Sequence, residues 1–125
     1  MSRTRFILVA LIVLPRTMHA QDSTGSHSAC RTVETTAEIR QCLNAANIRA
    51  DTLLRTALQQ ARSRAMYPLA LDSAQAAWDS YRSVQCRAES SQFEGGSLQL
   101  VVYLSCRLTL TQARARYVTS LFDEP

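Results

Sequence analysis

Four cysteines are the residues whose type and spacing point most directly to chemistry in this chain. No two of them form a Cys-x-x-Cys pair, so a zinc site is a poor interpretation. An even number of cysteines in a short chain is typical of the disulfide framework of an exported protein. We therefore expect disulfides, and no bound metal, at Cys30, Cys42, Cys86 and Cys106.

Groups that could catalyse a reaction are poorly arranged in the sequence. Glycoside hydrolysis needs two carboxylates that face each other across a cleft, and no recognisable motif places such a pair. Nucleophilic catalysis by Ser or Cys needs an adjacent base. His27, the only histidine after residue 20, lies in a small polar segment and not beside a candidate nucleophile in a folded element. We expect no catalytic residue and no cofactor, and interpret the chain as a protein that is not an enzyme.

The first 20 residues have the layout of a secretory leader. Arg3 and Arg5 precede an apolar run over residues 6–14, and Ala20 offers a small residue for cleavage. The run is too short to be interpreted as a membrane-spanning helix. We predict a signal peptide over residues 1–20 and a periplasmic or secreted product with no stable membrane anchor.

The charge is nearly balanced once the leader is set aside. All 14 basic residues are Arg, and removal of the three in the leader leaves eleven against ten acidic residues, a balance of +1. Nucleic-acid binding requires a concentrated basic stripe, so we expect no nucleic-acid partner. The small, polar residues 21–29 are predicted to be a flexible tether, followed by a single helical domain over residues 30–125.

A long helix is the first element predicted to position these residues. Thr35, followed three residues later by Glu38, matches a capping box, in which the hydroxyl and the carboxylate each satisfy a backbone amide. Apolar residues then recur three and four apart, the spacing of one helical face. The helix is expected from about residue 36 to about residue 64. Its apolar face consists of Ile39, Cys42, Leu43, Ala46, Ala50, Leu53, Leu54, Ala57 and Ala61.

A second helix is predicted after Tyr67-Pro68, because the residue before a proline disfavours helical geometry. Asp72 or Ser73 offers the amino-terminal cap, and Gln75 is placed to reach back to Asp72. The helix is expected from about residue 73 to about residue 89, with Trp78 and Tyr81 as core aromatics. Its buried face is expected to contain Leu71, Ala74, Trp78, Tyr81 and Gln85, with Ala77 and Val84 beside it.

A turn and a third helix complete the expected fold. Residues 90–97 have the composition of a turn. Residues 98–104 are apolar enough for a buried strand, which periodicity alone does not exclude. Cys106, Leu110, Ala113, Tyr117 and Leu121 continue the series at helical spacing, so we predict a helix over residues 98–121. Three helices with short links predict an all-α, antiparallel three-helix hairpin bundle.

The central part of the chain carries a specific motif. It reads Gln75-x-x-Trp78-x-x-Tyr81-Arg82-x-x-x-Cys86, then Gly95-Gly96, Cys106, Thr111 and Arg114, with Thr35-x-x-Glu38-x-x-x-Cys42 upstream. This pattern resembles the LprI-like (DUF1311-type) family of lysozyme inhibitors over nearly the whole chain after the leader. The resemblance implies an exported, helical, cysteine-containing protein that binds and inhibits lysozyme. Some members are lipoproteins, whereas the residues before Cys30 lack the apolar residue that lipidation requires.

Four cysteines allow three pairings, and their spacing favours local ones. A Cys30–Cys42 bond would fasten the preceding segment to the first helix, and a Cys86–Cys106 bond would join the second helix to the third. A loop of about 20 residues closed in this way contributes about 3 kcal/mol. One geometric difficulty is that Cys86 lies near the end of its helix, whereas Cys106 lies farther into the next one.

Residues near the turn are candidates for contact with a partner. The cleft of lysozyme contains two catalytic carboxylates, so an inhibitor needs a protruding polar or cationic group. Phe93 and Glu94 lie in the turn, and Arg82 and Arg87 lie near its base. The cleft carboxylates would repel Glu94, which makes Arg87 the stronger candidate.

Structural roles compete with these contacts. Arg82 has Asp79 or Asp51 as a candidate ion-pair partner, and Gln75 is as well suited to a helix cap as to a ligand. The motif residues Gln75, Trp78, Tyr81 and Arg82 are therefore interpreted mainly as a framework. An alternative function is that of a cell-envelope immunity factor or stress-related scaffold that binds a different secreted partner.

Overall fold

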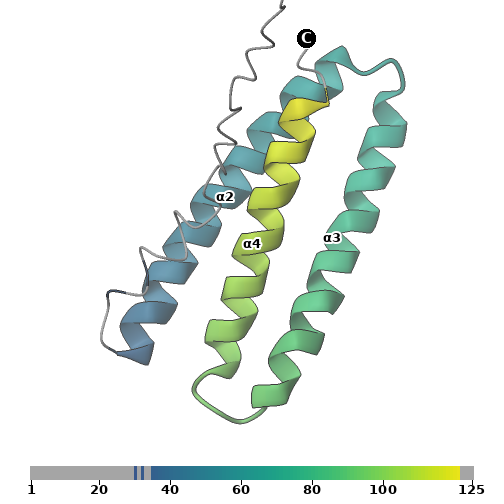
Figure 1. Cartoon of the computed structure of the whole chain (residues 1–125). Coiled ribbons are helices and arrows are strands. Elements are labelled where there is room, and N and C mark those ends of the chain that lie inside the picture. The colour runs from purple at the N-terminus through teal and green to yellow at the C-terminus, as the bar shows by residue number, and fades with distance from the viewer. Residues whose placement is uncertain (1–29, 31, 33–34, 122–125) are drawn as a thin grey trace, which may run out of the picture.

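The computed structural model describes residues 30, 32 and 35–121, which form three long helices and no strand. The helices are α2 (Thr36–Arg64), α3 (Pro68–Ser90) and α4 (Gln99–Ser120), and a short 3-10 helix, η1 (Ser91–Phe93), follows α3. Successive helices are antiparallel, and α4 lies between α2 and α3 (Figure 1). The predicted all-α hairpin bundle is confirmed. The predicted signal peptide and tether lie outside the described residues.

Helix α2 begins at the predicted capping box. The Glu38 amide donates to Thr35 Oγ1 at 3.2 Å, and the Thr35 amide donates to Glu38 Oε2 at 3.0 Å. Arg62 and Arg64 occupy the last turn, where positive charge suits the negative end of the helix dipole. The predicted bounds of this helix are confirmed.

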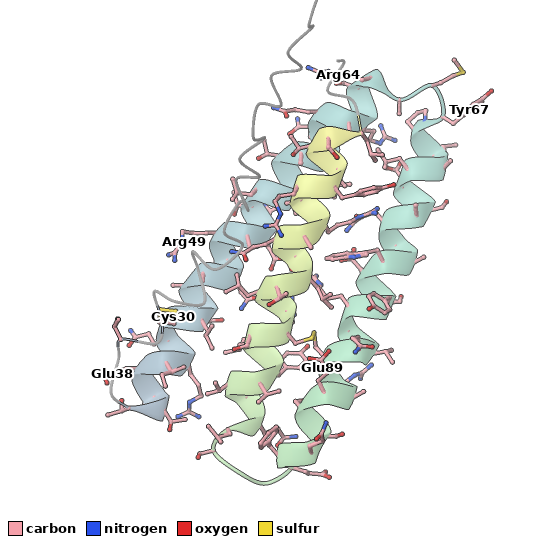
Figure 2. The ribbon with its side chains drawn as sticks, viewed as in Figure 1. Cys30, Glu38, Arg49, Arg64, Tyr67 and Glu89 are labelled. Atoms are coloured by element: carbon pink, nitrogen blue, oxygen red, sulfur yellow. A yellow bond between two sulfur atoms is a disulfide. The ribbon has the colours of Figure 1, made fainter. Side chains whose placement is uncertain are left out.

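Helix α3 begins five residues earlier than predicted, at Pro68 instead of Ser73. Proline suits the first helical position because that position needs no amide donor and proline already has a helical φ. Asp72 and Ser73 are therefore not caps. Ser73 Oγ donates to the Leu69 carbonyl at 2.9 Å inside the helix. Arg64 and Tyr67 mark the end of the molecule at which α2 meets α3 (Figure 2).

The apolar core lies mainly along the contact between α2 and α4. One cluster packs the buried apolar residues in the first half of α2 against Leu108. A second cluster packs those in the second half of α2 against Val118. The many alanines of α2 allow α4 to approach closely. Leu53 was expected in this core and is 65% exposed, so that prediction is wrong. The buried apolar residues of α2 are Leu43, Ala46, Ala50, Leu54, Ala57 and Ala61.

The face that α3 turns toward α4 differs from the predicted one. Trp78 and Leu71 are half-buried and pack against the second core cluster. Tyr81 is 52% exposed and Val84 is 60% exposed, so the placement of Tyr81 in the core is wrong. Only Cys86 and Ser90 of α3 are buried. The buried face of α4 also differs from the predicted one. Leu108, Thr111 and Val118 are buried, whereas Tyr117 and Leu121, which were predicted on the apolar face, are exposed.

Both predicted disulfides are confirmed. Cys30 is bonded to Cys42, and Cys86 is bonded to Cys106 with their Cα atoms 5.5 Å apart. Helix η1 extends α3, so Cys86 lies seven residues before the end of η1 and Cys106 lies seven residues after the first residue of α4. The two cysteines are thus level across the hairpin, which removes the geometric difficulty.

Candidate functional site

Arg82 is the centre of a polar cluster that joins all three long helices. Its side chain is only 12% exposed. One guanidinium nitrogen, Nη1, donates to Asp51 Oδ1 on α2 at 2.8 Å and to Thr111 Oγ1 on α4 at 2.7 Å. The other, Nη2, donates to Asp79 Oδ1 at 3.2 Å. Both ion pairs that the sequence suggested for Arg82 are therefore present.

A second arginine balances the charge of this cluster. Arg107 Nη2 on α4 lies 3.5 Å from Asp51 Oδ2, so the Asp51 carboxylate bridges two guanidinium groups. With Asp79, the cluster contains two positive and two negative side chains. Mutual compensation of this kind is what allows charged groups to lie between helices.

An aromatic and cationic stack continues from Arg82 along α3 and α4. The Arg82 guanidinium carbon lies 4.8 Å from the centre of the Trp78 ring, and that of Arg114 lies 5.8 Å from the same ring. Arg114 Nε donates to Gln75 Oε1 at 3.1 Å. Gln75 therefore acts as an acceptor between helices and not as a cap partner. These cation–π and hydrogen-bonded contacts fix the face of α3 that meets α4.

The hairpin between α3 and α4 ends in a turn with several backbone hydrogen bonds. The Glu94 amide donates to the Ser91 carbonyl at 3.1 Å, and the Gly96 amide donates to the Phe93 carbonyl at 2.9 Å. Gly95 has a φ of 75°, a conformation that side chains other than glycine disfavour. Together with the disulfide, these bonds restrict the conformations that the turn can adopt.

The sequence matches the model of one known protein family. The family model described as lysozyme inhibitor LprI matches residues 27–118. The chain belongs to the LprI family. Searches of curated proteins and of solved structures each found no match. The LprI match covers both disulfides and most of the three helices, so the family resemblance read from the motif is confirmed.

The LprI motif residues fall on two sides of α3. Gln75, Trp78 and Arg82 contact α4 or α2 as described above. On α4, Thr111 accepts from Arg82, whereas Arg114 donates to Gln75 and lies over the Trp78 ring. Tyr81 is exposed and does not take part in these contacts between helices. The family motif thus coincides with the polar contacts between helices.

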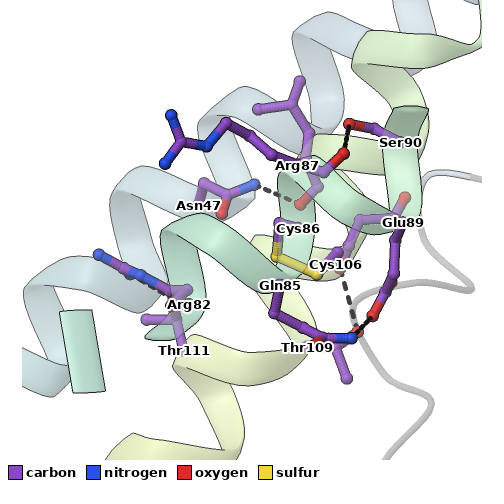
Figure 3. Close-up of a disulfide and its surroundings, with 12 residues drawn as sticks. Asn47, Arg82, Gln85, Cys86, Arg87, Glu89, Ser90, Cys106, Thr109 and Thr111 are labelled. Atoms are coloured by element: carbon purple, nitrogen blue, oxygen red, sulfur yellow. Dashed lines mark hydrogen bonds between the residues drawn. A yellow bond between two sulfur atoms is a disulfide. The ribbon is translucent and has the colours of Figure 1, made fainter. Parts of the chain in front are cut away.

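The four candidate contact residues are not all brought together. Arg87 is exposed in the last turn of α3, directly after Cys86, and its side chain extends away from the disulfide (Figure 3). Phe93 is 41% exposed, and Glu94 is exposed beside it. Arg87, Phe93 and Glu94 therefore share one end of the molecule, whereas the Arg82 guanidinium lies in the polar cluster.

Two polar residues of this LprI-family chain were missed by sequence reasoning. Asn47 is buried in α2 and donates to the carbonyls of Leu43 and Leu104, each at 2.9 Å. An amide beside the apolar series was a signal for such a contact. Arg107 offered no signal, because its partner depends on how α2 and α4 are aligned.

Neither a metal cluster nor a membrane-spanning helix is found among the described residues. Within residues 30, 32 and 35–121, no group of three His, Cys, Asp or Glu side chains is placed to hold a metal ion. No helix in the same part of the chain is both long enough and apolar enough to span a bilayer.

An exposed ion pair joins α2 and α3 at their linked ends. Arg62 Nε lies 3.1 Å from both Asp72 oxygens, and Nη2 lies 2.9 Å from Oδ2. The hydrogen bonds from Arg62 lower the pKa of the Asp72 carboxyl, and the same bonds raise the pKa of Arg62. This pair fastens the first turns of α3, where the sequence predicted a cap.

Proposed function

We propose that this LprI-family protein binds lysozyme and inhibits it without catalysing a reaction. The family match over residues 27–118 is the observation that carries the proposal. Lysozyme acts through two carboxylates in an open cleft, so a rigid protein that places a cationic group in that cleft blocks it. Inhibition by occupation needs no catalytic residue in the inhibitor.

The contact proposed for lysozyme is the disulfide-linked end of the α3–α4 hairpin. Arg87 is exposed there, and Phe93 adds an apolar side chain on the adjoining turn. The Cys86–Cys106 bond and the turn hydrogen bonds hold this end before binding. A pre-ordered contact loses less conformational entropy on association, which favours tight binding.

The roles proposed for the two arginines differ. Arg87 would pair with a cleft carboxylate, because its guanidinium is accessible. Arg82 already bonds to Asp51, Asp79 and Thr111, so its proposed role is to position α3. Glu94 lies beside the contact and would face away from the cleft carboxylates or weaken binding.

A lysis assay with the purified, oxidised protein tests this proposal. Inhibition of lysozyme is expected to rise with the concentration of the protein, and Arg87→Ala is expected to weaken it about tenfold, as for a central contact residue. Arg55→Ala is the matched control, because Arg55 is exposed on α2, which does not form the hairpin. Arg55→Ala should inhibit as the unmodified protein does.

Two results would change the proposal in different ways. Inhibition that is equal in Arg87→Ala and Arg55→Ala would move the contact to another surface and leave the function intact. Lysis that is unaffected by a large molar excess of the protein would contradict the function. The protein would then fit better as an envelope immunity factor or stress-related scaffold, and capture of its partner from an envelope extract would identify that role.

Export to the periplasm or the medium is part of the same proposal. Two disulfides and the family support it, because such bonds persist in oxidising compartments. Fractionation of the native host, with mass measurement of the mature protein, is the test. A mature chain that begins at Gln21 is expected, and a reduced, full-length cytosolic product would contradict it.

A further inference from the structure

Helix α3 carries a regular apolar stripe on a face that no other described element covers. Its six residues are spaced alternately four and three apart, the heptad spacing of a helix that packs against another helix. Every one of them is exposed. They are Ala70, Ala74, Ala77, Tyr81, Val84 and Ala88.

The stripe contrasts with the face that α3 turns toward α4. That inner face contacts its neighbours largely through Gln75, Trp78 and Arg82. The more continuous apolar pattern of the helix is therefore on its outside. Its regular spacing is the one that a helix uses to pack against another helix.

The order of small and large residues along the stripe makes it complementary to itself. Alanine occupies the first three positions, and the larger Tyr81 and Val84 follow. A two-fold axis at Asp79 would place Tyr81 against Ala77 of a second copy, and Val84 against Ala74. Each large side chain then meets an alanine, as knobs-into-holes packing requires. We propose that α3 packs antiparallel against α3 of a second copy and forms a reversible homodimer.

Charge is compatible with this pairing. The stripe contains no charged residue, and Ser73 and Ser80 border the edge on which Arg87 also lies. The two-fold axis would put Arg87 near Ser73 of the second copy, and the two Arg87 side chains at opposite ends of the helix pair. Antiparallel helices also align their dipoles favourably. No like charges meet across the pair.

The size of the stripe indicates a weak dimer. From Ala70 to Ala88 the helix rises about 27 Å and is about 10 Å wide, which gives a footprint of roughly 300 Å² on each copy. The two copies together would bury roughly 600 Å², about half or less of what a standard stable interface buries, so only a weak and transient association is expected. The dimer is therefore expected to form at micromolar to millimolar concentrations. It does not depend on the proposed binding of lysozyme.

Sedimentation of the oxidised protein, without any partner, tests the dimer. The unmodified protein should shift from monomer to dimer between about 1 µM and 1 mM. Ala77→Glu should raise the dimer dissociation constant at least tenfold, because the introduced carboxylates lie close together near the two-fold axis. Ala76→Glu is the matched control, since Ala76 is exposed on another side of the same helix. Glutamate is a good helix former, and circular dichroism verifies that both variants fold.

Mixing two variants tests the register. Labelled Ala77→Glu should enter a dimer with an excess of Tyr81→Arg, because the axis at Asp79 places these two positions against each other. An excess of Ala88→Arg should recruit the labelled chain much less. A protein that stays monomeric up to about 1 mM, an equal effect of Ala77→Glu and Ala76→Glu, or equal recruitment by the two arginine variants would overturn the proposal.

Discussion

Arg82 on α3 donates a 2.8 Å hydrogen bond to the Asp51 carboxylate on α2. Apart from this bond and the exposed Arg62–Asp72 pair, α2 and α3 make little contact. The bond passes beside Thr111 of α4, which accepts from the same nitrogen. Because α3 buries few apolar side chains, this cluster and the Cys86–Cys106 disulfide hold the helix in place. The stability of α3 therefore depends unusually strongly on polar and covalent contacts.

Loss of the Arg82 side chain should destabilise the fold. Arg82→Ala leaves Asp51 and Thr111 without a shared donor, and we expect it to lower the free energy of unfolding by about 1–3 kcal/mol. Arg82→Lys should not restore stability, because an ammonium does not reproduce the geometry of the planar guanidinium. Denaturant unfolding measures both. The exposed Arg87→Ala serves as the control, and an equal loss in that variant would contradict the role given to Arg82.

Removal of the hairpin disulfide should loosen α3 selectively. Replacing Cys86 and Cys106 together by Ala opens a loop with a sequence separation of 20 residues. The expected loss is about 3 kcal/mol in the chain-entropy model. Hydrogen exchange should accelerate in α3 more than along the α2–α4 contact. Replacing Cys30 and Cys42 is the comparison, and the expectation fails if that pair accelerates exchange in α3 equally.

Leu53, which the sequence placed on the apolar face of α2, and Leu108, which lay outside the predicted apolar series of α4, should differ in their contribution to stability. Leu108 is fully buried on α4, so Leu108→Ala is expected to cost about 2–5 kcal/mol through lost burial and a cavity. Leu53 is 65% exposed, so Leu53→Ala should change stability by less than about 0.5 kcal/mol. Thermal and denaturant unfolding distinguish them. A large loss for Leu53→Ala would show that another chain covers that surface.

The Arg62–Asp72 pair should give a small stability difference that depends on pH. The folded-state pKa of Asp72 is lowered, so the pair contributes above the unfolded pKa of about 3.9, and its contribution is lost as the pH falls through the folded pKa. The melting temperature of the unmodified protein should exceed that of Asp72→Asn by a constant margin from about pH 5 to 7. The margin should close below about pH 4 and shrink in high salt. A margin that widens in acid would contradict the assignment.

Local signals in the sequence indicated three helices and favoured the cysteine pairs that form. The capping box at Thr35 and Glu38 placed the start of α2 because both bonds form within four residues. The start of α3 is also encoded locally, by a proline at the first helical position. The capping pattern at Asp72 resembles a helix start as well, and it led to a predicted start that is five residues too late. Short separations made the pairings Cys30–Cys42 and Cys86–Cys106 the favoured ones, since closing a short loop costs little entropy.

Only the tertiary structure decided which face of each helix is buried. Periodicity identifies an apolar face but not the neighbour that covers it, and α3 packs closely against α4 alone. Tyr81 therefore remains exposed, while Arg82 turns inward to partners 29 and 31 residues away in the sequence. The sequence by itself indicated three helices, of which α2 has a capping box and α3 begins with a proline, favoured two local disulfides, and carried the family motif. The polar cluster and the uncovered stripe on α3 followed from the relative placement of the helices, which depends on contacts between residues far apart in the chain.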